Sequence, residues 1–310
     1  MMRYLSRIIA IVICFAISGC DVYDQFRDEM YMNVFCLIGD SENIYATTHS
    51  FKNEVSEGFV SIYCGGTNSI ENDVTIVLEY DSVSIQEYNE LNYDLDTARY
   101  TQWLHPSKYE IQTFSATMKA GQEDPYVVIP LKIFTKGITP DSIFFIPLKI
   151  KSITEGYTVN PDMSKVLYRP FVENDYAQTK VQTLYGLRGN SNGTEITATK
   201  IAFPISANQI RISVGKQTVL DGNSRIDLDL INKYSIVLTV NENNTVSVGP
   251  YATIQVEQLG EPGENRMEIT DLTRFYIHYR YRTLEQPATE TSEAVYSSWI
   301  EVDETLRRQN

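Results

Sequence analysis

Histidine, tryptophan and cysteine are scarce in this sequence, which limits the chemistry that the chain can carry out. Its 310 residues include 3 His, 2 Trp and 4 Cys. No two of the histidines (His49, His105 and His278) have the spacing of paired metal ligands or of a zinc-protease helix. A Gly-x-Ser-x-Gly elbow, a phosphate-binding glycine loop with lysine and a dinucleotide fingerprint are also missing. We therefore predict neither a metal site nor a cofactor.

Carboxylates are plentiful, but they do not follow a recognised catalytic pattern. Glycoside hydrolysis needs two acids about 5–10 Å apart across a cleft. Against the chitinase-type pattern Asp-x-x-Asp-x-Asp-x-Glu, the nearest match is Asp227-x-Asp229, with Ile231 where the glutamate is needed. Apolar residues alternate with these aspartates, which predicts a strand with a solvated acidic face. We predict a non-catalytic protein, with a hydrolase that uses an unrecognised acid pair as the alternative.

Positive charge is also in short supply. Lys and Arg number 26 against 40 Asp and Glu, a formal net charge of −14. Such a surface repels phosphate backbones, so we expect no nucleic-acid partner. It also disfavours adhesion to an anionic membrane by charge alone, so any membrane attachment has to come from a lipid.

Long apolar runs are absent except at the N-terminus. Arg3 and Arg7 precede an apolar run of about ten residues, which is the layout of a secretion signal and is too short to span a bilayer. The run ends in Ile17-Ser18-Gly19-Cys20, which is similar to a bacterial lipobox. We predict a signal peptide over residues 1–19, lipidation of Cys20 and a tether over residues 20–30. An ordinary signal peptide with a chance cysteine is the alternative.

Two cysteines remain once Cys14 leaves with the signal and Cys20 is acylated. Cys36 and Cys64 each lie in a strand-like run, and Val34 and Ile38 share the predicted face of Cys36. Outside the cytoplasm a disulfide can persist. A disulfide and two buried free thiols explain the pair equally well, and both interpretations stay open.

Short period-two apolar runs between turn-forming clusters predict β-structure almost throughout. About 290 residues after the signal suit two domains. We predict an all-β fold: an N-terminal immunoglobulin-like antiparallel β-sandwich over residues 31–170, then a second antiparallel β-sandwich or β-barrel over residues 178–310. The boundary is placed near residues 168–178, where polar residues and Pro170 are expected to interrupt the strands.

Three local patterns add detail to this fold. Ile-Pro-Leu-Lys-Ile occurs at residues 129–133 and 146–150, and the proline in each copy predicts an edge strand or a bulge. Residues 241–244 (Asn-Glu-Asn-Asn) separate two strand-like runs and predict a hairpin, because asparagine tolerates the left-handed backbone. Residues 84–96 are the clearest candidate for a short helix or loop.

Tyrosine is the residue in surplus, with 21 copies. Sugar rings stack on exposed aromatic side chains, while amides and carboxylates bind their hydroxyl groups. Aromatic residues in β-proteins also build cores and strand faces, so each is a candidate only. The candidate ligand-binding residues are Tyr100, Trp103 and Tyr109 in one connection, and Tyr296 and Trp299 near the C-terminus.

Several motifs in each half of the chain form a recognisable set. Those of the first half are Tyr88-Asn89, Tyr100, residues 104–109 (Leu-His-Pro-Ser-Lys-Tyr), 118–121 (Met-Lys-Ala-Gly), 146–150, and 156–160 (Gly-Tyr-Thr-Val-Asn). Those of the second half are residues 208–212 (Asn-Gln-Ile-Arg-Ile), 234–240, 244–246, 275–280, and Trp299 with residues 304–307. Together they resemble a two-domain family of Bacteroidetes surface lipoproteins, and the likeness covers nearly all of the chain after the signal.

The resemblance implies an outer-membrane lipoprotein that faces the cell exterior and assists a polysaccharide-utilisation system as an adhesin or glycan-binding accessory. It carries over no catalytic residue. The implied partners are the bilayer, through Cys20, and a polysaccharide or host or matrix glycan; a place in an outer-membrane transporter complex, as a structural or assembly subunit, is the alternative. Family members at the cell surface often carry an acidic cluster after the lipidated cysteine. Here residues 21–29 are acidic but interrupted, so display toward the periplasm stays open.

Overall fold

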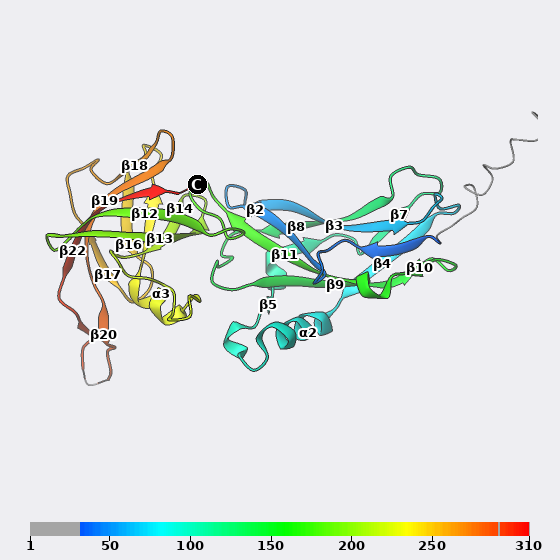
Figure 1. Ribbon diagram of the computed structural model, residues 1–310, viewed down its shortest axis with the longest axis horizontal. Helices are drawn as coiled ribbons and strands as arrows, with labels where there is room; N and C mark the ends of the chain where they lie inside the picture. Colours follow the sequence, from blue (N-terminus) through cyan, green and yellow to red (C-terminus); the bar gives the residue numbers. More distant parts are fainter. Residues whose placement is uncertain (1–31, 291, 310) are drawn as a thin grey trace, which may run out of the picture.

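The computed structural model describes residues 32–290 and 292–309. These form two β-rich lobes that lie end to end along the long axis (Figure 1). The predicted signal, Cys20 and the tether lie outside the described residues. Among the described residues, no helix is both long enough and apolar enough to cross a membrane. The all-β, two-domain prediction is confirmed.

The first lobe is a sandwich of two sheets. One sheet has the strand order β10-β1-β3-β8-β6 and the other the order β2-β11-β9-β4-β7, with β5 beside β9. Their strands are β1 (Val34–Leu37), β2 (Ile44–Ser50), β3 (Val55–Gly65), β4 (Val74–Tyr80), β5 (Gln102–Trp103), β6 (Tyr109–Ile111), β7 (Ser115–Met118), β8 (Tyr126–Phe134), β9 (Phe144–Ile153), β10 (Thr158–Val159) and β11 (Lys165–Glu173). Pairing is antiparallel except in β1–β10, β2–β11 and β5–β9. The apolar faces of the two sheets meet in one core.

The second lobe is one strongly curved sheet with the order β16-β15-β14-β13-β12-β22-β19-β17, and β18 also pairs with β19. The two end strands lie beside each other, where Val248 N donates to Gln258 Oε1 at 2.8 Å, so the sheet nearly closes into a barrel. Its strands are β12 (Thr183–Ser191), β13 (Thr194–Ser206), β14 (Gln209–Ser213), β15 (Ser235–Val240), β16 (Val246–Pro250), β17 (Gln255–Gln258), β18 (Arg266–Ile269), β19 (Thr273–Arg282) and β22 (Ile300–Arg308). The small hairpin of β20 (Leu284–Gln286) and β21 (Val295–Tyr296) projects from this lobe (Figure 1).

The predicted hairpin joins β15 to β16. Asn244 has a φ of 62°, the left-handed value that its sequence position predicts. Asn244 N donates to Asn241 O, and Asn241 N to Thr245 O, both at 2.9 Å. This prediction is confirmed.

The two Ile-Pro-Leu-Lys-Ile copies lie on β8 and β9, which are both interior strands, so the prediction of edge strands is wrong. A bulge, the other alternative, occurs just after the second copy, where the register between β9 and β4 shifts after Ile150. Each proline lies one residue before the pairing with a short neighbour begins. The β6 ladder starts at Leu131, after Pro130, and the β4 ladder starts at Leu148, after Pro147. Neither proline therefore removes a donor from the ladder to that neighbour.

Pro170 does not interrupt its strand either. Strand β11 runs through it to Glu173, and the β9 ladder beside it has already ended at Tyr168. On its other side Pro170 stays in parallel register with Thr47 of β2. The strands are interrupted within the predicted stretch, but after Glu173 rather than at Pro170, so the first lobe's sheet reaches beyond residue 170.

In the structure, Cys36 and Cys64 are buried free thiols and form no disulfide, which is the second of the two interpretations. Cys64 pairs with Phe35 across the sheet, and Cys36 pairs with Tyr63. Paired residues share a face, so the two cysteine side chains leave opposite faces of the sheet. Phe35, not Cys36, enters the core, which corrects the predicted apolar face of this strand. Burial raises the pKa of both thiols.

Helix α2 (Ser82–Tyr93) overlaps the stretch predicted as a short helix or loop, residues 84–96, and packs on the outer face of the second sheet. Its Tyr88 ring meets Phe145 edge-on, with ring centroids 5.0 Å apart. Asn89 is buried and forms three hydrogen bonds to Thr101, two by its Oδ1 and one by its Nδ2, at 2.7–3.0 Å. The helix therefore fixes the connection that carries Trp103.

A buried histidine makes the first lobe sensitive to acid. His49 on β2 is 0% exposed and contacts Ser56 Oγ at 2.9 Å and Tyr168 Oη at 2.8 Å. Burial lowers its pKa to about 4. The unfolded chain takes up this proton near pH 6.5 and the folded chain only near pH 4. Stability therefore falls as the pH drops through this window, by about 3 kcal/mol.

Urea unfolding at a series of pH values tests this expectation. The wild-type chain should lose stability between pH 6.5 and 4, and His49→Gln should remove most of that slope while being less stable near pH 7. An unchanged slope in the variant would assign the acid sensitivity to other groups.

Candidate functional site

The first aromatic candidates lie at the edge of the first lobe, but they do not form a common exposed platform. Trp103 is partly exposed on β5, and its Nε1 donates to Tyr109 Oη at 3.1 Å. Tyr109 is only 6% exposed, so the structure makes it a core residue rather than a ligand contact. Tyr100 donates its hydroxyl to Asp94 O at 2.6 Å and braces the loop after α2.

Tyr80, which the sequence did not single out, holds this cluster together. Its ring meets those of Trp103, Tyr109 and Phe114 with centroids 5.3, 6.2 and 5.1 Å apart, all edge-on. Edge-on rings stabilise one another but present no common flat face. The cluster is therefore mainly structural.

The second pair of aromatic candidates does come together, on the outer face of the barrel. Tyr296 lies on β21 and Trp299 immediately before β22, and both are partly exposed. The Arg280 and Arg282 guanidinium carbons lie 4.7 and 4.8 Å from the centre of the Trp299 ring. Arg282 is also 5.0 Å from the centre of the Tyr296 ring. Cation–π contacts of this kind orient both rings on the sheet surface.

Strand pairing adds polar groups beside these rings. Across the β17–β19 ladder, Gln255 lies opposite Arg282 and Glu257 lies opposite Arg280. Gln255 Oε1 accepts from Arg282 Nε at 2.7 Å, and Glu257 Oε2 accepts from Arg280 Nε at 2.7 Å. Arg280 and Glu257 are 42% and 48% exposed, so both remain open to a ligand. We call this group the Trp299 surface: Gln255, Glu257, Arg280, Arg282, Tyr296 and Trp299.

The arrangement of the Trp299 surface suits a polyhydroxyl ligand. Aromatic rings accept the C–H face of a sugar, and planar amide, carboxylate and guanidinium groups bind neighbouring hydroxyls. Strand alternation places Arg280 and Arg282 on one face, so sequence could have signalled these two. Gln255 and Glu257 could not have been found this way, because their place depends on which strand pairs with β19.

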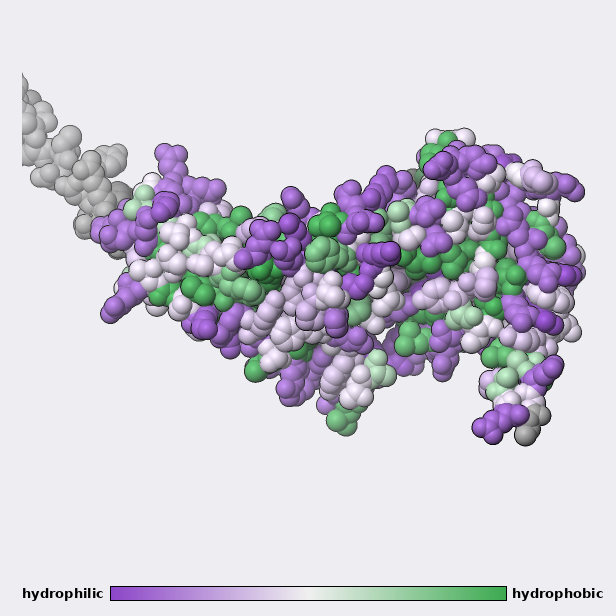
Figure 2. All heavy atoms as spheres, turned by 180° about the vertical axis from the view of Figure 1, so that it is seen from behind, coloured by the Kyte–Doolittle hydropathy of each residue, from purple (hydrophilic) through white to green (hydrophobic). Residues whose placement is uncertain are grey.

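A second exposed surface covers the outer side of the first lobe. On β3 and β8, Phe59, Tyr126 and Val128 are 43%, 46% and 49% exposed, and Tyr63 lies 5.0 Å from Tyr126 between ring centroids. A cavity of about 510 Å³ extends along Phe59 and Val128 to Lys132. We call Phe59, Tyr63, Tyr126, Val128 and Pro130 the Phe59 face. Apolar patches on both lobes are visible from behind in Figure 2.

The sequence matches two family models, one for each half of the chain. Residues 24–156 match the family model of an N-terminal domain, and residues 164–307 match that of a C-terminal domain. The chain belongs to this two-domain family. No curated protein matches the sequence.

Solved structures from Bacteroides share its fold. A protein of unknown function from Bacteroides ovatus superposes with a TM-score of 0.60 at 15% identity, covering 88% of this chain and 94% of that one. A multidomain protein including DUF1735, also from Bacteroides ovatus, gives 0.57 at 15% identity, covering 89% and 95%. An auxiliary nutrient binding protein from Bacteroides thetaiotaomicron gives 0.53 at 18% identity, covering 87% and 93%. At these identities the likeness establishes the fold alone.

Proposed function

We propose that this member of the family is a non-catalytic, lipid-anchored protein of the outer membrane that binds a saccharide at the cell exterior, as an accessory of a polysaccharide-utilisation system. The observation that carries the proposal is the Trp299 surface, where two aromatic rings and four hydrogen-bonding side chains share one exposed sheet face. The name of the Bacteroides thetaiotaomicron neighbour, an auxiliary nutrient binding protein, agrees with such a role.

The carboxylates at this surface contact basic side chains, which supports binding without turnover. Glu257 is paired with Arg280, and Glu301 contacts His278 Nε2 at 2.9 Å. Both therefore hold a basic side chain in place on the same sheet face. Within residues 32–290 and 292–309, no three His, Cys, Asp or Glu side chains are grouped as a metal site would require.

The saccharide proposal is tested by Trp299→Ala. We expect the variant to bind a recognised saccharide about tenfold more weakly, because loss of one stacked ring costs about 1.4 kcal/mol. A glycan array screens for the ligand, and isothermal titration with the full chain in detergent measures the affinity. Trp103→Ala is the matched control, since it removes the other tryptophan from a cluster that is mainly structural. Equal losses in the two variants would argue against the Trp299 surface, and a blank array would argue against saccharide binding.

Anchoring is tested at Cys20. In cells grown with labelled palmitate, the wild-type chain should carry label and fractionate with the outer membrane, because a multiply acylated N-terminus gives a stable anchor. Cys20→Ser should carry no label and leave the membrane fraction. Protease added to intact cells should digest the wild-type chain if it faces the exterior. Label retained in Cys20→Ser would contradict lipidation at this residue, and protection from protease would contradict surface display.

The Phe59 face favours a second candidate, a structural subunit of an outer-membrane uptake complex. A contiguous exposed apolar patch is typical of a protein contact rather than of free surface. Co-purification of a membrane transporter with the full chain, abolished by Val128→Lys and unaffected by Trp299→Ala, would favour this candidate over saccharide binding.

A further inference from the structure

A cluster of arginines stands out on the barrel because the protein as a whole is acidic, with a net charge of −14. Arg188 on β12, Arg274 on β19, and Arg307 and Arg308 on β22 all line one groove of about 630 Å³. Concentrating like charge in a groove creates a local positive potential and attracts anions. This groove is separate from the Trp299 surface, which lies at the other end of β19.

Strand register explains why the arginines meet. Strand β22 lies between β12 and β19, and Arg307 pairs with Arg274 on one side and with Gly186 on the other. Gly186 has no side chain beside Arg307 and lines the groove, with the Gln309 amide next to it. A Cβ at this position would come within 3.1 Å of Gln309 Nε2. Arg188, two residues along β12 from Gly186, adds its guanidinium at the same face.

The groove contains too little negative charge to neutralise these groups. Asp271 contacts Arg274 Nη2 at 2.8 Å and Arg307 Nη2 at 3.4 Å. Arg308 Nη1 donates to a neutral carbonyl, Asp175 O, at 3.1 Å. Arg188 forms no ion pair with any residue that the structure describes. Glu268 lies opposite Arg274 across the β18–β19 ladder but is paired with Arg266. Two carboxylates therefore lie beside four guanidinium groups, and the guanidinium groups of Arg188 and Arg307 are exposed.

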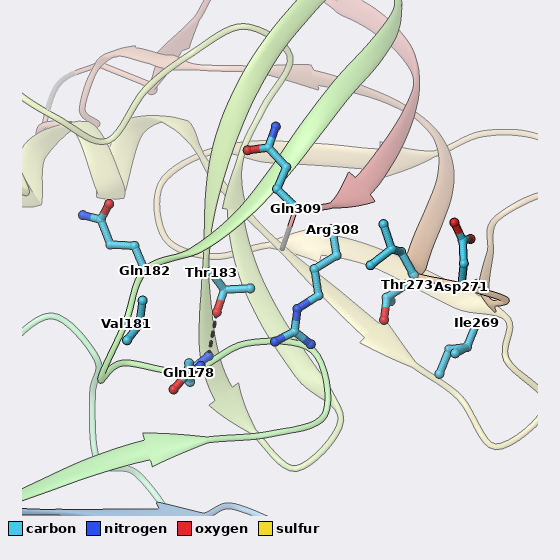
Figure 3. Close-up of a pocket in the computed structure, with 10 residues that line it drawn as sticks. Gln178, Val181, Gln182, Thr183, Ile269, Asp271, Thr273, Arg308 and Gln309 are labelled. Atoms are coloured by element: carbon cyan, nitrogen blue, oxygen red, sulfur yellow. Dashed lines mark hydrogen bonds between the residues drawn. The ribbon is translucent and has the colours of Figure 1, made fainter.

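A second cavity of about 420 Å³ continues the groove toward the first lobe and shares Leu272, Arg308 and Gln309 with it. Figure 3 shows Arg308 projecting between the segment from Gln178 to Thr183 and the segment from Ile269 to Thr273. Besides Arg308, Asp271 and Leu272, the lining consists of amides and hydroxyls, with exposed apolar residues at the rim: Gln178, Gln182, Gln309, Thr183, Thr273, Val181 and Ile269. Amides suit sugar hydroxyls, and apolar groups suit sugar C–H faces.

We propose that the joined groove binds an acidic saccharide, with the carboxylate or sulfate of the sugar held by Arg188, Arg274 and Arg307 and the neutral part of the chain running past Arg308 along the amides. Guanidinium groups bind such anions through paired hydrogen bonds. The amide and apolar groups along the second cavity favour a sugar chain over a phosphate backbone or a membrane surface. This inference rests on the proposed saccharide binding and narrows its ligand class.

The test uses the full chain in detergent and three oligosaccharides of matched length: neutral, uronate-containing and sulfated. We expect at least one acidic oligosaccharide to bind more tightly than the neutral one, and its affinity to fall as NaCl is raised. Arg307→Gln and Arg188→Gln should each weaken that binding about fivefold. Arg225→Gln is the control, since it removes an arginine that pairs with Asp221 outside the groove and should leave binding unchanged. Thermal melts verify that each variant is folded.

The possible results separate this inference from the proposed function. Binding of the uronate or the sulfated chain that depends on Arg307 and Arg188 supports the inference and identifies the anion. Binding of the neutral chain alone, dependent on Trp299, overturns the inference and leaves the proposed function standing. Binding of none of the three, with a blank glycan array, overturns both. Poly-glutamate serves as a fourth probe. If it binds as tightly as the acidic oligosaccharide, and its binding also depends on Arg307 and Arg188, the saccharide class is overturned, because the groove would then be a general anion site.

Discussion

Lys200→Met is expected to lower the free energy of unfolding by about 3–5 kcal/mol. Lys200 and Glu304 face each other inside the barrel, with their side chains 1% and 0% exposed and Nζ 2.6 Å from Oε1. Lys200 also donates to Ser213 O at 2.8 Å, and Tyr279 Oη donates to the same Glu304 oxygen at 3.1 Å. Removing the cation leaves a carboxylate buried without its partner, which costs much more than the pair contributes.

The pH dependence of this variant is a sharper test than its stability alone. Burial raises the pKa of Glu304 and lowers the pKa of Lys200, since desolvation penalises both charged forms. Without Lys200, the pKa of Glu304 should rise further. A carboxyl group whose pKa is raised on folding contributes most below its unfolded value of about 4.5 and loses that contribution as the pH rises. The defect of Lys200→Met should therefore be smaller at pH 4.5 than at pH 8 in urea unfolding.

The double variant Lys200→Met with Glu304→Leu is the control. Replacing both charges with apolar groups of similar size removes the buried charge, so much of the lost stability should return. Glu304 Oε2 is buried and has no partner among the described residues, so the pair is imperfectly satisfied even in the wild-type chain. If the double variant is as unstable as the single one, the loss comes from altered packing rather than from an unpaired charge.

Much of the fold could be predicted because strand alternation is a local signal. Alternating apolar residues over 126–134 and 143–153 predict two strands; β8 spans the first of these runs residue for residue, and β9 begins one residue after the start of the second. The helix α3 (Leu228–Tyr234) was missed for a physical reason. Apolar residues alternate there for only a few positions, which fits a strand and a helix start equally. Asp227 is the cap: its Oδ1 accepts from Asp229 N at 2.8 Å and Leu230 N at 3.0 Å.

The predicted acidic strand at residues 227–230 is therefore wrong, although its sequence carried the signal that would have corrected it. Aspartate before a helix-forming run is a favoured N-cap, since its side chain satisfies amides that have no partner in the first turn. The candidate site was harder to foresee. Trp299 and Tyr296 could be named from composition, but the arginines that orient them come from β19, 14–19 residues earlier. Which strands become neighbours depends on tertiary packing, and no local pattern reports it.

Asp141→Ala is expected to destabilise the chain by about 3–5 kcal/mol and to loosen the two lobes from each other. Asp141 lies in the first lobe, in the loop between β8 and β9, and Arg211 lies on β14 of the barrel. The Arg211 side chain is 0% exposed and binds Asp141 with both terminal nitrogens, one of them at 2.6 Å. Its guanidinium carbon is 4.8 and 4.7 Å from the ring centres of Phe203 and Tyr251. Among the described residues, this planar, fully buried cation is thus neutralised only by a residue of the other lobe.

A matched control comes from an exposed ion pair near the junction, between the turn after β2 and the segment that follows β11. Lys52 Nζ lies 2.6 Å from Asp175 Oδ1, but these side chains are 56% and 51% exposed. Solvent screens such a pair, so Asp175→Ala should cost less than about 1 kcal/mol. Chemical denaturation gives both stabilities, and small-angle X-ray scattering reports whether the lobes separate.

Only Asp141→Ala should broaden the distribution of distances between the two lobes. In Asp175→Ala, water can take the place of the lost carboxylate beside Lys52, whereas water cannot reach Arg211 unless the interface opens. If both variants lose equal stability and the scattering curves coincide, Arg211 is held by its ring contacts and the carboxylate is not what fixes the lobes. If the prediction holds, the groove beside Arg308 has a fixed shape. Its lining residues come from the barrel and from the segment 178–183 that enters the barrel, and a rigid junction keeps the distance between these two parts constant.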